Sequence, residues 1–383
     1  MKRLLSIALI LTICTALLAA CDSSSTKGET TDESLNSSEK VTEVTGLLNP
    51  EKQTLIRVDY LSDDSRLIFY TQDHQLYAAK ISKAEERLGN PVNIWNNIFA
   101  EYVMLQNGFY VYDPSGEFCN LYDYNLKLLS RIPLPTDGQP PCFCISNDLE
   151  TMAYAQITIE NDNEYLQVYS GKVGSSEKQK ILSRKITNLP ANQLAGIDSM
   201  RFLSDDRTIF YTGGFYPQNG ENVESRPCFG TFGADGKNLK TILSGIEYRF
   251  SYFDGGYLKY DTNVPAGETS SGKIEIFQNN GTSKTITLKK SNESQSVYIS
   301  QNGDYFCTVL EEATDTQITV DFTLYDAKTG APIGQNSYHS ALPKGSASDN
   351  IVQNVSVANH SKQVSAVVTS LEDDAQRLLE FDF

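Results

Sequence analysis

A two-part pattern of apolar and polar positions recurs along the chain. In each copy an apolar strand ends in a short turn of Ser, Asp, Asn or Gly, and a second, more continuously apolar strand follows. The second strands include LIFY at 67–70 and YFCTVL at 305–310. A sheet with one solvent-exposed face alternates apolar and polar residues, so these continuous runs predict strands that are buried on both faces.

Seven copies of this pattern follow one another through most of the chain. They lie at residues 55–70, 98–112, 142–157, 197–212, 246–260, 295–310 and 351–368. Their first residues are 43 to 56 positions apart. Repeats of about 40–50 residues are typical of the blades of β-propellers, in which each repeat forms one small sheet.

The polar turns inside the copies have sequences that favour tight hairpins. Asn107-Gly108 and Asn302-Gly303 supply the Asn-Gly pair, which tolerates the positive φ of a two-residue turn. In Ser62-Asp63-Asp64 and Ser204-Asp205-Asp206, we expect the side-chain oxygens to cap the amides of the turn. Each copy therefore predicts a β-hairpin.

Further strands follow each hairpin. A third strand is predicted at Gln75–Ile81 and at Ile318–Tyr325, and a fourth at Gln179–Ile186. Four strands per repeat predict an all-β fold, a seven-bladed β-propeller of four-stranded antiparallel blades over residues 41–383. A β-sandwich is the competing fold, but it would explain the strands and not the sevenfold repeat.

The last repeat contains only three predicted strands, because the chain ends after Gln376–Phe383. Val41–Leu48, at the other end of the same domain, is a candidate for the missing outer strand. Pairing of the two chain ends would join the first and last repeats and remove exposed sheet edges.

The repeats also resemble those of a known group of propellers. Ser-Asp-Asp followed by RLIFY or RTIFY, and then by a strand such as QLYAAKIS, is similar to the repeats of TolB-like and WD-repeat-like propellers. The resemblance covers about residues 54–383, although no repeat has the Trp-Asp dipeptide and Trp95 is the only tryptophan. It implies a rigid disc that binds a protein or another ligand, and it transfers no particular binding residue.

The N-terminus has the features of an export signal. Lys2 and Arg3 precede an apolar stretch of about 14 residues, which is short for a membrane span of about 20 residues. Leu18-Ala19-Ala20-Cys21 resembles the bacterial lipobox, which implies that residues 1–20 are cleaved and that Cys21 carries diacylglycerol. An ordinary secretory signal cut near Ala20 and an uncleaved membrane helix are the alternatives.

The segment after Cys21 is polar. Residues 22–40 contain one clearly apolar residue, Leu35, so residues 21–40 are predicted to form a lipidated, disordered tether. The two acyl chains of a diacylglyceryl group are sufficient for stable anchoring. Asp22 resembles the signal for retention in the inner membrane. We therefore expect the protein on the extracytoplasmic face of the cell membrane.

Charge and cysteine content limit the classes of function. The formal net charge of −16 argues against a nucleic-acid ligand, which is bound by clustered Lys and Arg. Five cysteines follow the lipobox, an odd number that leaves at least one unpaired within the chain. Cys142 and Cys144 have no second close pair with which to bind zinc, so we interpret them as small buried residues of strands.

No motif identifies a reaction, a cofactor or a metal. GETSSGKI at 267–274 resembles a phosphate-binding loop, but it lacks the final Ser or Thr and precedes a predicted strand, not a helix. The oxygen-rich segments 161–164 and 372–374 do not match the twelve-residue calcium loop. His74 and His360 lie in predicted turns. We therefore assign no catalytic residue, no cofactor and no metal ligand.

Candidate contact residues come from long loops. Phe215–Pro227, Asp261–Gly272 and Ser340–Asn350 are predicted to lie on the face that carries the connections between blades. Within the first of these loops, Phe215 and Tyr216 are candidate aromatic contacts and Arg226 is a candidate polar anchor.

Together these features predict a monomeric, lipid-anchored binding or scaffold protein that recognises a protein partner in the cell envelope. Binding of a carbohydrate or a peptide is the alternative, which the 21 tyrosines of the chain permit. A hydrolase or lyase with catalytic residues on the propeller loops is the less favoured third hypothesis.

Overall fold

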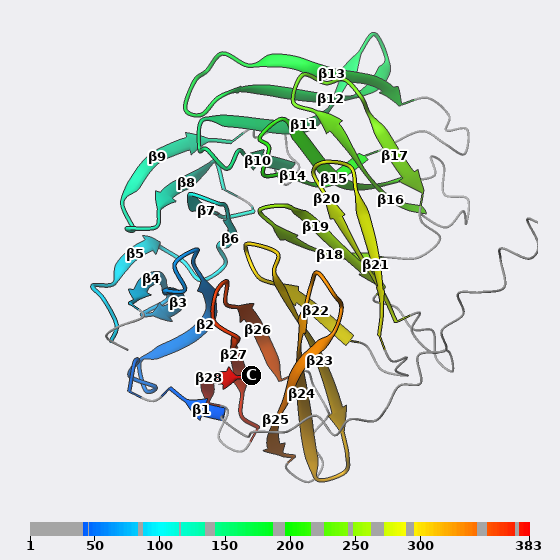
Figure 1. Ribbon diagram of the computed structural model, residues 1–383. Coiled ribbons are helices and arrows are strands. Elements are labelled where there is room, and N and C mark those ends of the chain that lie inside the picture. The colour runs from blue at the N-terminus through cyan, green and yellow to red at the C-terminus, as the bar shows by residue number, and fades with distance from the viewer. Residues whose placement is uncertain are drawn as a thin grey trace, which may run out of the picture. The chain divides into compact units, whose positions relative to one another are not determined.

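Seven four-stranded antiparallel sheets make up the part of the chain that the computed structural model describes (Figure 1). They form the blades of a seven-bladed β-propeller, which confirms the predicted fold class. The chain divides into the units Met1–Asn36 and Ser37–Phe383, and every blade belongs to the second. The described residues are 41–44, 46–82, 87–114, 116–134, 142–186, 196–215, 226–243, 248–261, 272–288, 295–342, 351–371 and 375–383.

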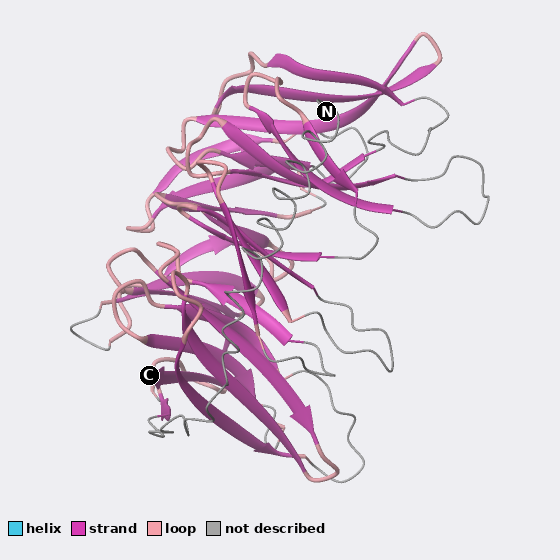
Figure 2. Ribbon diagram, turned by 45° about the vertical axis from the view of Figure 1, so that its right-hand side comes forward, coloured by secondary structure: helices cyan, strands magenta, loops and turns pink. Residues whose placement is uncertain are grey.

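The predicted signal peptide at 1–20 and the predicted tether at 21–40 lie outside the described residues, so both remain predictions. Figure 2 shows strands and connecting loops in the described part. Among these residues there is no helix that is long and apolar enough to cross a membrane.

The first four blades follow the chain order, with the earliest strand of each at one edge of its sheet. Blade 1 contains β2 (Gln53–Tyr60), β3 (Arg66–Gln72), β4 (Gln75–Ile81) and β5 (Val92–Trp95). Blade 2 contains β6 (Glu101–Met104), β7 (Gly108–Tyr112), β8 (Phe118–Asp123) and β9 (Leu128–Pro133). Blade 3 contains β10 (Cys142–Ile145), β11 (Thr151–Glu160), β12 (Asn163–Lys172) and β13 (Gln179–Ile186). Blade 4 contains β14 (Gly196–Phe202), β15 (Thr208–Phe215), β16 (Arg226–Gly233) and β17 (Lys240–Leu243).

The remaining blades complete the ring. Blade 5 contains β18 (Tyr248–Phe253), β19 (Gly256–Asp261), β20 (Lys273–Gln278) and β21 (Ser283–Thr287). Blade 6 contains β22 (Gln295–Ile299), β23 (Tyr305–Ala313), β24 (Gln317–Asp326) and β25 (Pro332–Ala341). Blade 7 contains β26 (Val352–Val357), β27 (Gln363–Thr369), β28 (Gln376–Asp382) and, from the other end of the domain, β1 (Val41–Glu43).

The second strand of a blade is buried on both faces, as its continuous apolar sequence predicts. In β3, residues Leu67–Tyr70 are at most 1 % exposed. The Phe69 ring stacks on Tyr102 of blade 2 at 4.5 Å between centroids and meets Phe109 edge-on at 5.4 Å. The core therefore lies between neighbouring sheets, where burial of apolar surface contributes roughly 25 cal/mol per Å².

The two ends of the domain meet in blade 7. β1 pairs antiparallel with β28, with Val41 opposite Phe381 and Glu43 opposite Leu379. This confirms that the N-terminal segment supplies the missing outer strand. The strand is shorter than the candidate segment 41–48, because Leu47 and Leu48 instead pack against a hydrophobic cluster shared by blades 1 and 7.

A carboxylate in the turn of blade 1 binds the turn of blade 7. The Oδ1 atom of Asp64 accepts a hydrogen bond from the amide of Asn359 at 2.7 Å, and its Oδ2 atom accepts one from the amide of Ser361 at 3.0 Å. The amide of His360 also donates to this carboxylate. In return, the side-chain amide of Asn359 donates to the carbonyl oxygen of Leu61 at 2.9 Å. Hydrogen bonds therefore close the ring at this turn as well as at β1.

Blades 3 and 4 are joined by the same arrangement. Asp206 accepts hydrogen bonds from the amides of Asn147, at 2.6 Å, and Asp148, at 3.0 Å. The Asn147 side chain donates to the carbonyl oxygen of Leu203 at 3.0 Å. The prediction that both aspartates of each Ser-Asp-Asp turn cap their own turn is therefore only half correct.

The first aspartate of each turn does cap its own amides. Asp63 accepts a hydrogen bond from the amide of Ser65 at 2.9 Å, and Asp205 accepts one from the amide of Thr208 at 2.9 Å. The second aspartate bonds to the preceding blade in the ring, a contact that the spacing within one repeat cannot indicate.

We expect Asp64→Asn to lower the free energy of unfolding by about 2 kcal/mol, because charge-assisted bonds to three amides are lost or weakened. Asn tolerates the positive φ of 59° at this position as well as Asp does. The matched variant Asp63→Asn, whose side chain is largely exposed, should change it by less than about 1 kcal/mol. Urea denaturation measures both, and equal effects would contradict the role assigned to the turn of blade 1.

Candidate functional site

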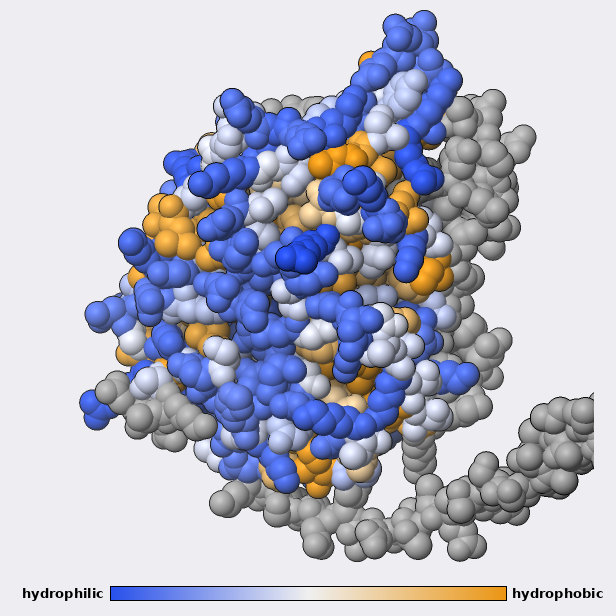
Figure 3. All heavy atoms as spheres, turned by 45° about the horizontal axis from the view of Figure 1, so that its top comes forward, coloured by the Kyte–Doolittle hydropathy of each residue, from blue (hydrophilic) through white to orange (hydrophobic). Residues whose placement is uncertain are grey.

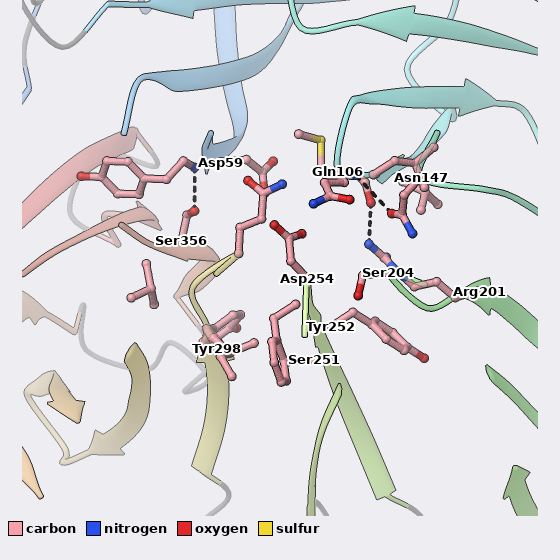
Figure 4. A pocket seen from close by; sticks show the side chains of 18 of the residues that line it. Asp59, Gln106, Asn147, Arg201, Ser204, Ser251, Tyr252, Asp254, Tyr298 and Ser356 are labelled. Atoms are coloured by element: carbon pink, nitrogen blue, oxygen red, sulfur yellow. Dashed lines mark hydrogen bonds between the residues drawn. The ribbon is translucent and has the colours of Figure 1, made fainter. Parts of the chain in front are cut away.

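A cavity of about 290 Å³ lies where the innermost strands of the blades converge (Figure 4). This volume is at the lower end of the range for small-molecule pockets. All seven blades contribute to its lining, through residues that include Arg57, Tyr102, Asn147, Arg201, Asp254, Tyr298 and Ser356. Most of these residues lie near the ends of the innermost strands, beside the turns that lead to the second strands. We call this space the axial cavity.

Arg57 and Asp59 form a bidentate ion pair in the wall of the axial cavity. The two residues are two positions apart on β2, so their side chains emerge from the same face of the strand. The Nε atom of Arg57 donates to Oδ2 of Asp59 at 2.6 Å, and its Nη2 atom donates to Oδ1 at 2.8 Å. The guanidinium also lies 5.1 Å from the ring centroid of Tyr102. Each member of the pair therefore neutralises the charge of the other.

Arg201 of blade 4 is held by neutral groups. Its Nη2 atom donates to the carbonyl oxygen of Met104 at 2.5 Å, and its guanidinium carbon lies 4.7 Å from the ring centroid of Tyr252. Within the described part of the chain, no carboxylate lies within ion-pair distance of Arg201. The arginine therefore brings a positive charge to the cavity that no described side chain cancels by direct contact.

Asp254, directly after β18, is the corresponding anion. Its backbone amide donates to the carbonyl oxygen of Gln301 at 2.6 Å. Hydrogen bonding by the side chains of Gln301 and Gln106 acts to lower the pKa of its carboxyl group. Burial raises the pKa of Asp254, and these two hydrogen bonds and the charge of Arg201 offset that effect only in part. Among the residues that the structure describes, no Lys or Arg is within ion-pair distance of this carboxylate.

Tyrosines supply much of the remaining wall. Burial raises the pKa of both Tyr102 and Tyr298 to about 12, so both hydroxyls are neutral near pH 7. Tyr124 donates its hydroxyl to the carbonyl oxygen of Leu105. The axial cavity therefore combines neutral aromatic side chains with two separate, uncancelled charges.

The axial cavity presents charged, polar and aromatic side chains to a ligand, among them Ser204, Ser251 and Ser356. Its described lining contains no His, Lys or Cys that would act as a base or nucleophile. Of its two carboxylates, Asp59 is bound to Arg57. Such an arrangement can hold a polar ligand in a defined orientation.

The two strand ends that flank the long loop are at the end of blade 4 opposite the axial cavity. Phe215 is the last residue of β15, Arg226 is the first of β16, and the two face each other in register. β15 begins beside the cavity and ends at Phe215, so this loop leaves the opposite end of blade 4. Tyr216 and the rest of the loop, 216–225, lie outside the described residues, and the role of these three residues stays a prediction.

The five cysteines of the described residues are free thiols, and all except the half-buried Cys142 are buried. Burial raises the pKa of Cys119, Cys142 and Cys228 to about 12. These thiols are therefore protonated near pH 7, in accord with the interpretation of Cys142 and Cys144 as small residues of strands. The described residues contain no group of three or more His, Cys, Asp or Glu side chains with the geometry of a metal site.

The sequence analysis missed Arg57, Arg201 and Asp254. A signal for the first two is present, because each is a charged residue that interrupts an apolar strand shortly before a turn. Arg201 stands three positions before Ser204, as Asp59 stands three positions before Ser62. Equivalent positions in different repeats indicate a shared cavity only when the strands are known to surround one axis.

Comparisons with known proteins define the fold and no more. No protein-family model and no curated protein matches the chain. A structure of a prolyl endopeptidase is similar over 86 % of this chain and 47 % of that one, with a TM-score of 0.50 and 14 % identity. At this identity the likeness concerns the propeller fold alone.

Two further structures show weaker similarity. A catalytically inactive virginiamycin B lyase from Staphylococcus aureus, in a structure with quinupristin, has a TM-score of 0.47 and 8 % identity over 89 % of this chain and 99 % of that one. An acylaminoacyl peptidase has a TM-score of 0.41 and 9 % identity over 84 % of this chain and 43 % of that one. The chain spans less than half the length of both peptidases.

We expect Asp254→Asn to raise the melting temperature at pH 7 by a few degrees. The raised pKa means that folding favours the protonated carboxyl group, so stability is lost as the pH rises through the pKa of the folded state. Below the ordinary pKa of aspartate the group is protonated in both states, and the difference from the unchanged protein should vanish. Thermal unfolding between pH 3 and pH 8 measures this, with the pH values taken around the ordinary pKa of about 3.9.

Asp59→Asn provides the matched control in the same cavity. It leaves Arg57 without its carboxylate, so the melting temperature at pH 7 should fall. A fall of similar size in both variants would contradict the view that Asp254 is the destabilising charge.

Proposed function

We propose that this chain is a membrane-anchored extracytoplasmic binding protein that holds a small polar ligand in the axial cavity and catalyses no reaction. The observation that carries this proposal is the pair of charges, on Arg201 and Asp254, that the described side chains leave uncancelled. Functional sites are commonly built from groups that lower the stability of the fold, and charged groups that line a cavity without direct counter-ions are of this kind.

The location is proposed on the sequence alone. The basic start, the short apolar stretch and Leu18-Ala19-Ala20-Cys21 support an acylated Cys21, and the polar residues 22–40 support a tether. The acidic character of the chain favours a propeller that is held near the membrane by lipid, not by attraction to anionic headgroups.

A carbohydrate or peptide ligand is compatible with the tyrosines of the axial cavity. The TolB-like and WD-repeat-like resemblance supports binding by a rigid disc, without indicating a ligand. The proposal places the ligand at the axis and not at the long loop of Phe215, Tyr216 and Arg226.

A protein partner in the cell envelope is the second candidate, and exposed apolar residues favour it. Phe99 is 76 % exposed and Ile159 is 74 % exposed, both at the end of the blades from which the long loops leave. Asn97 holds the short connection between blades 1 and 2 that contains Phe99. Its side chain accepts a hydrogen bond from the amide of Phe99 and donates one to Asp113. The face visible in Figure 3 is mainly hydrophilic with separate small apolar patches, so it offers no broad apolar surface.

The anchor is tested with Cys21→Ala in a bacterial host that acylates lipoproteins. We expect the unchanged protein to partition into detergent and to incorporate labelled palmitate, and the variant to lose the label, because the sulfur that carries diacylglycerol is absent. Ser23→Ala, two positions away, should behave as the unchanged protein. Equal labelling of all three proteins would contradict lipidation of Cys21.

The axial cavity is tested by filling it. We expect Met104→Trp to abolish retention of small molecules that copurify with the propeller, because the indole would occupy the space between the innermost strands. Leu128→Trp adds a similar bulk at a residue that is 49 % exposed on β9, and it should leave retention unchanged. Mass spectrometry of denatured preparations measures the retained compounds, and equal retention by both variants would place the ligand elsewhere.

A further inference from the structure

The two uncancelled charges of the axial cavity have opposite signs. Arg201 lies at the end of β14 and Asp254 directly after β18, so neighbouring blades contribute one charge each. The other charged residues of the lining, Arg57 and Asp59, bind each other in a two-point contact. The net charge of the lining is therefore zero, but its charge distribution is dipolar.

Neutral contacts hold these two charges apart. Arg201 donates to a backbone oxygen of blade 2, and its guanidinium stacks against Tyr252. The backbone amide of Asp254 donates to the carbonyl oxygen of Gln301 in blade 6, and the side chains of Gln106 and Gln301 lower the pKa of its carboxyl group. The charge of Arg201 lowers the pKa of Asp254 although the two groups do not form an ion pair, so they share one electrostatic environment without contact.

This separation has an energetic consequence. An ion that is partly removed from water without a counter-ion is destabilising, and a direct salt bridge within the protein reduces this cost. Among the described residues, Arg201 and Asp254 form no such bridge. A ligand that brings a negative group to Arg201 and a positive group to Asp254 would replace the missing contacts at both ends.

The size and walls of the cavity restrict such a ligand further. A volume of about 290 Å³ admits a small molecule and excludes a folded chain. A neutral sugar would leave both charges without a partner, and a simple anion or cation would satisfy only one of them. The neutral rings of Tyr252 and Tyr298 are suited to contacts with the uncharged part of a ligand.

We infer that the axial cavity binds a small zwitterion of the free amino acid class, with its carboxylate against Arg201 and its ammonium group against Asp254. A guanidinium can donate two parallel hydrogen bonds to a carboxylate, and one of the donors of Arg201 is already used by Met104. This inference rests on the proposed function, because it names the ligand of the same cavity.

The experiment uses the full mature chain, purified in detergent, and isothermal titration calorimetry. The probes are the L-amino acids, their N-acetyl derivatives, which lack the ammonium group, and their amides, which lack the carboxylate. We expect one or more amino acids to bind with one-to-one stoichiometry. Each derivative should bind at least about tenfold more weakly, which corresponds to about 1.4 kcal/mol.

Two variants assign the ends of the ligand. Asp254→Asn should bind the amino acid and its N-acetyl derivative with similar affinity, because the partner of the ammonium group is gone. Arg201→Gln, which retains a donor for Met104, should cease to distinguish the amino acid from its amide. Asp235→Asn removes an exposed charge that is not part of the lining and should preserve both preferences. Thermal melting of each variant confirms that it is folded.

The outcomes separate this inference from the proposed function. If oligosaccharides bind, Met104→Trp blocks them and neither charge variant changes their affinity, the zwitterion inference is wrong and ligand binding at the axis stands. If amino acids bind but the derivatives bind equally well, the inference is also wrong. If neither amino acids nor oligosaccharides bind, the inference is overturned; if Met104→Trp also retains the same copurifying compounds as the unchanged protein, the axial ligand site is overturned as well.

Discussion

Contacts between turns of neighbouring blades are the constraint on which the rest of this propeller depends. A four-stranded sheet with two apolar faces is stable only when a sheet covers each face, so the ring has to close. Asp64 and Asp206 bind the turn amides of the preceding blade, and β1 completes the sheet of the last blade. These contacts hold the innermost strands in place around one axis, and apolar packing between sheets provides most of the stabilising free energy.

The axial cavity follows from the same closure. Strands that converge on an axis leave a space that their own side chains fill only in part, and the residues at their ends come from all seven blades. Arg201 and Asp254 form no salt bridge in this cavity, and each is bound to another blade, Arg201 through Met104 and Asp254 through Gln301. Closure of the seven blades around one axis therefore both stabilises the fold and places two separated charges at its centre.

The position of the axial cavity also changes where function is expected. The long loops direct attention to one end of the blades, whereas the cavity lies beside the turns at the other end. A protein with both features can present a loop surface and an internal ligand site on opposite faces. The exposed Phe99 and Ile159 belong to the loop end, so a protein contact there and a small ligand at the axis do not compete for the same residues.

The sequence by itself determined the repeat, the strands and the closure. Seven copies of an apolar pattern require sheets that are covered on both faces, and a last repeat with three strands requires a fourth from elsewhere. The local pattern and the number of strands per repeat were therefore sufficient to predict the fold. The prediction of a lipobox at Leu18–Cys21 likewise depends on adjacent residues only. Only the tertiary structure decided that Asp64 binds Asn359 and that Arg201 and Asp254 share a cavity. Such contacts join residues of different repeats, and their distances depend on the angle and spacing of whole blades, which no local pattern encodes.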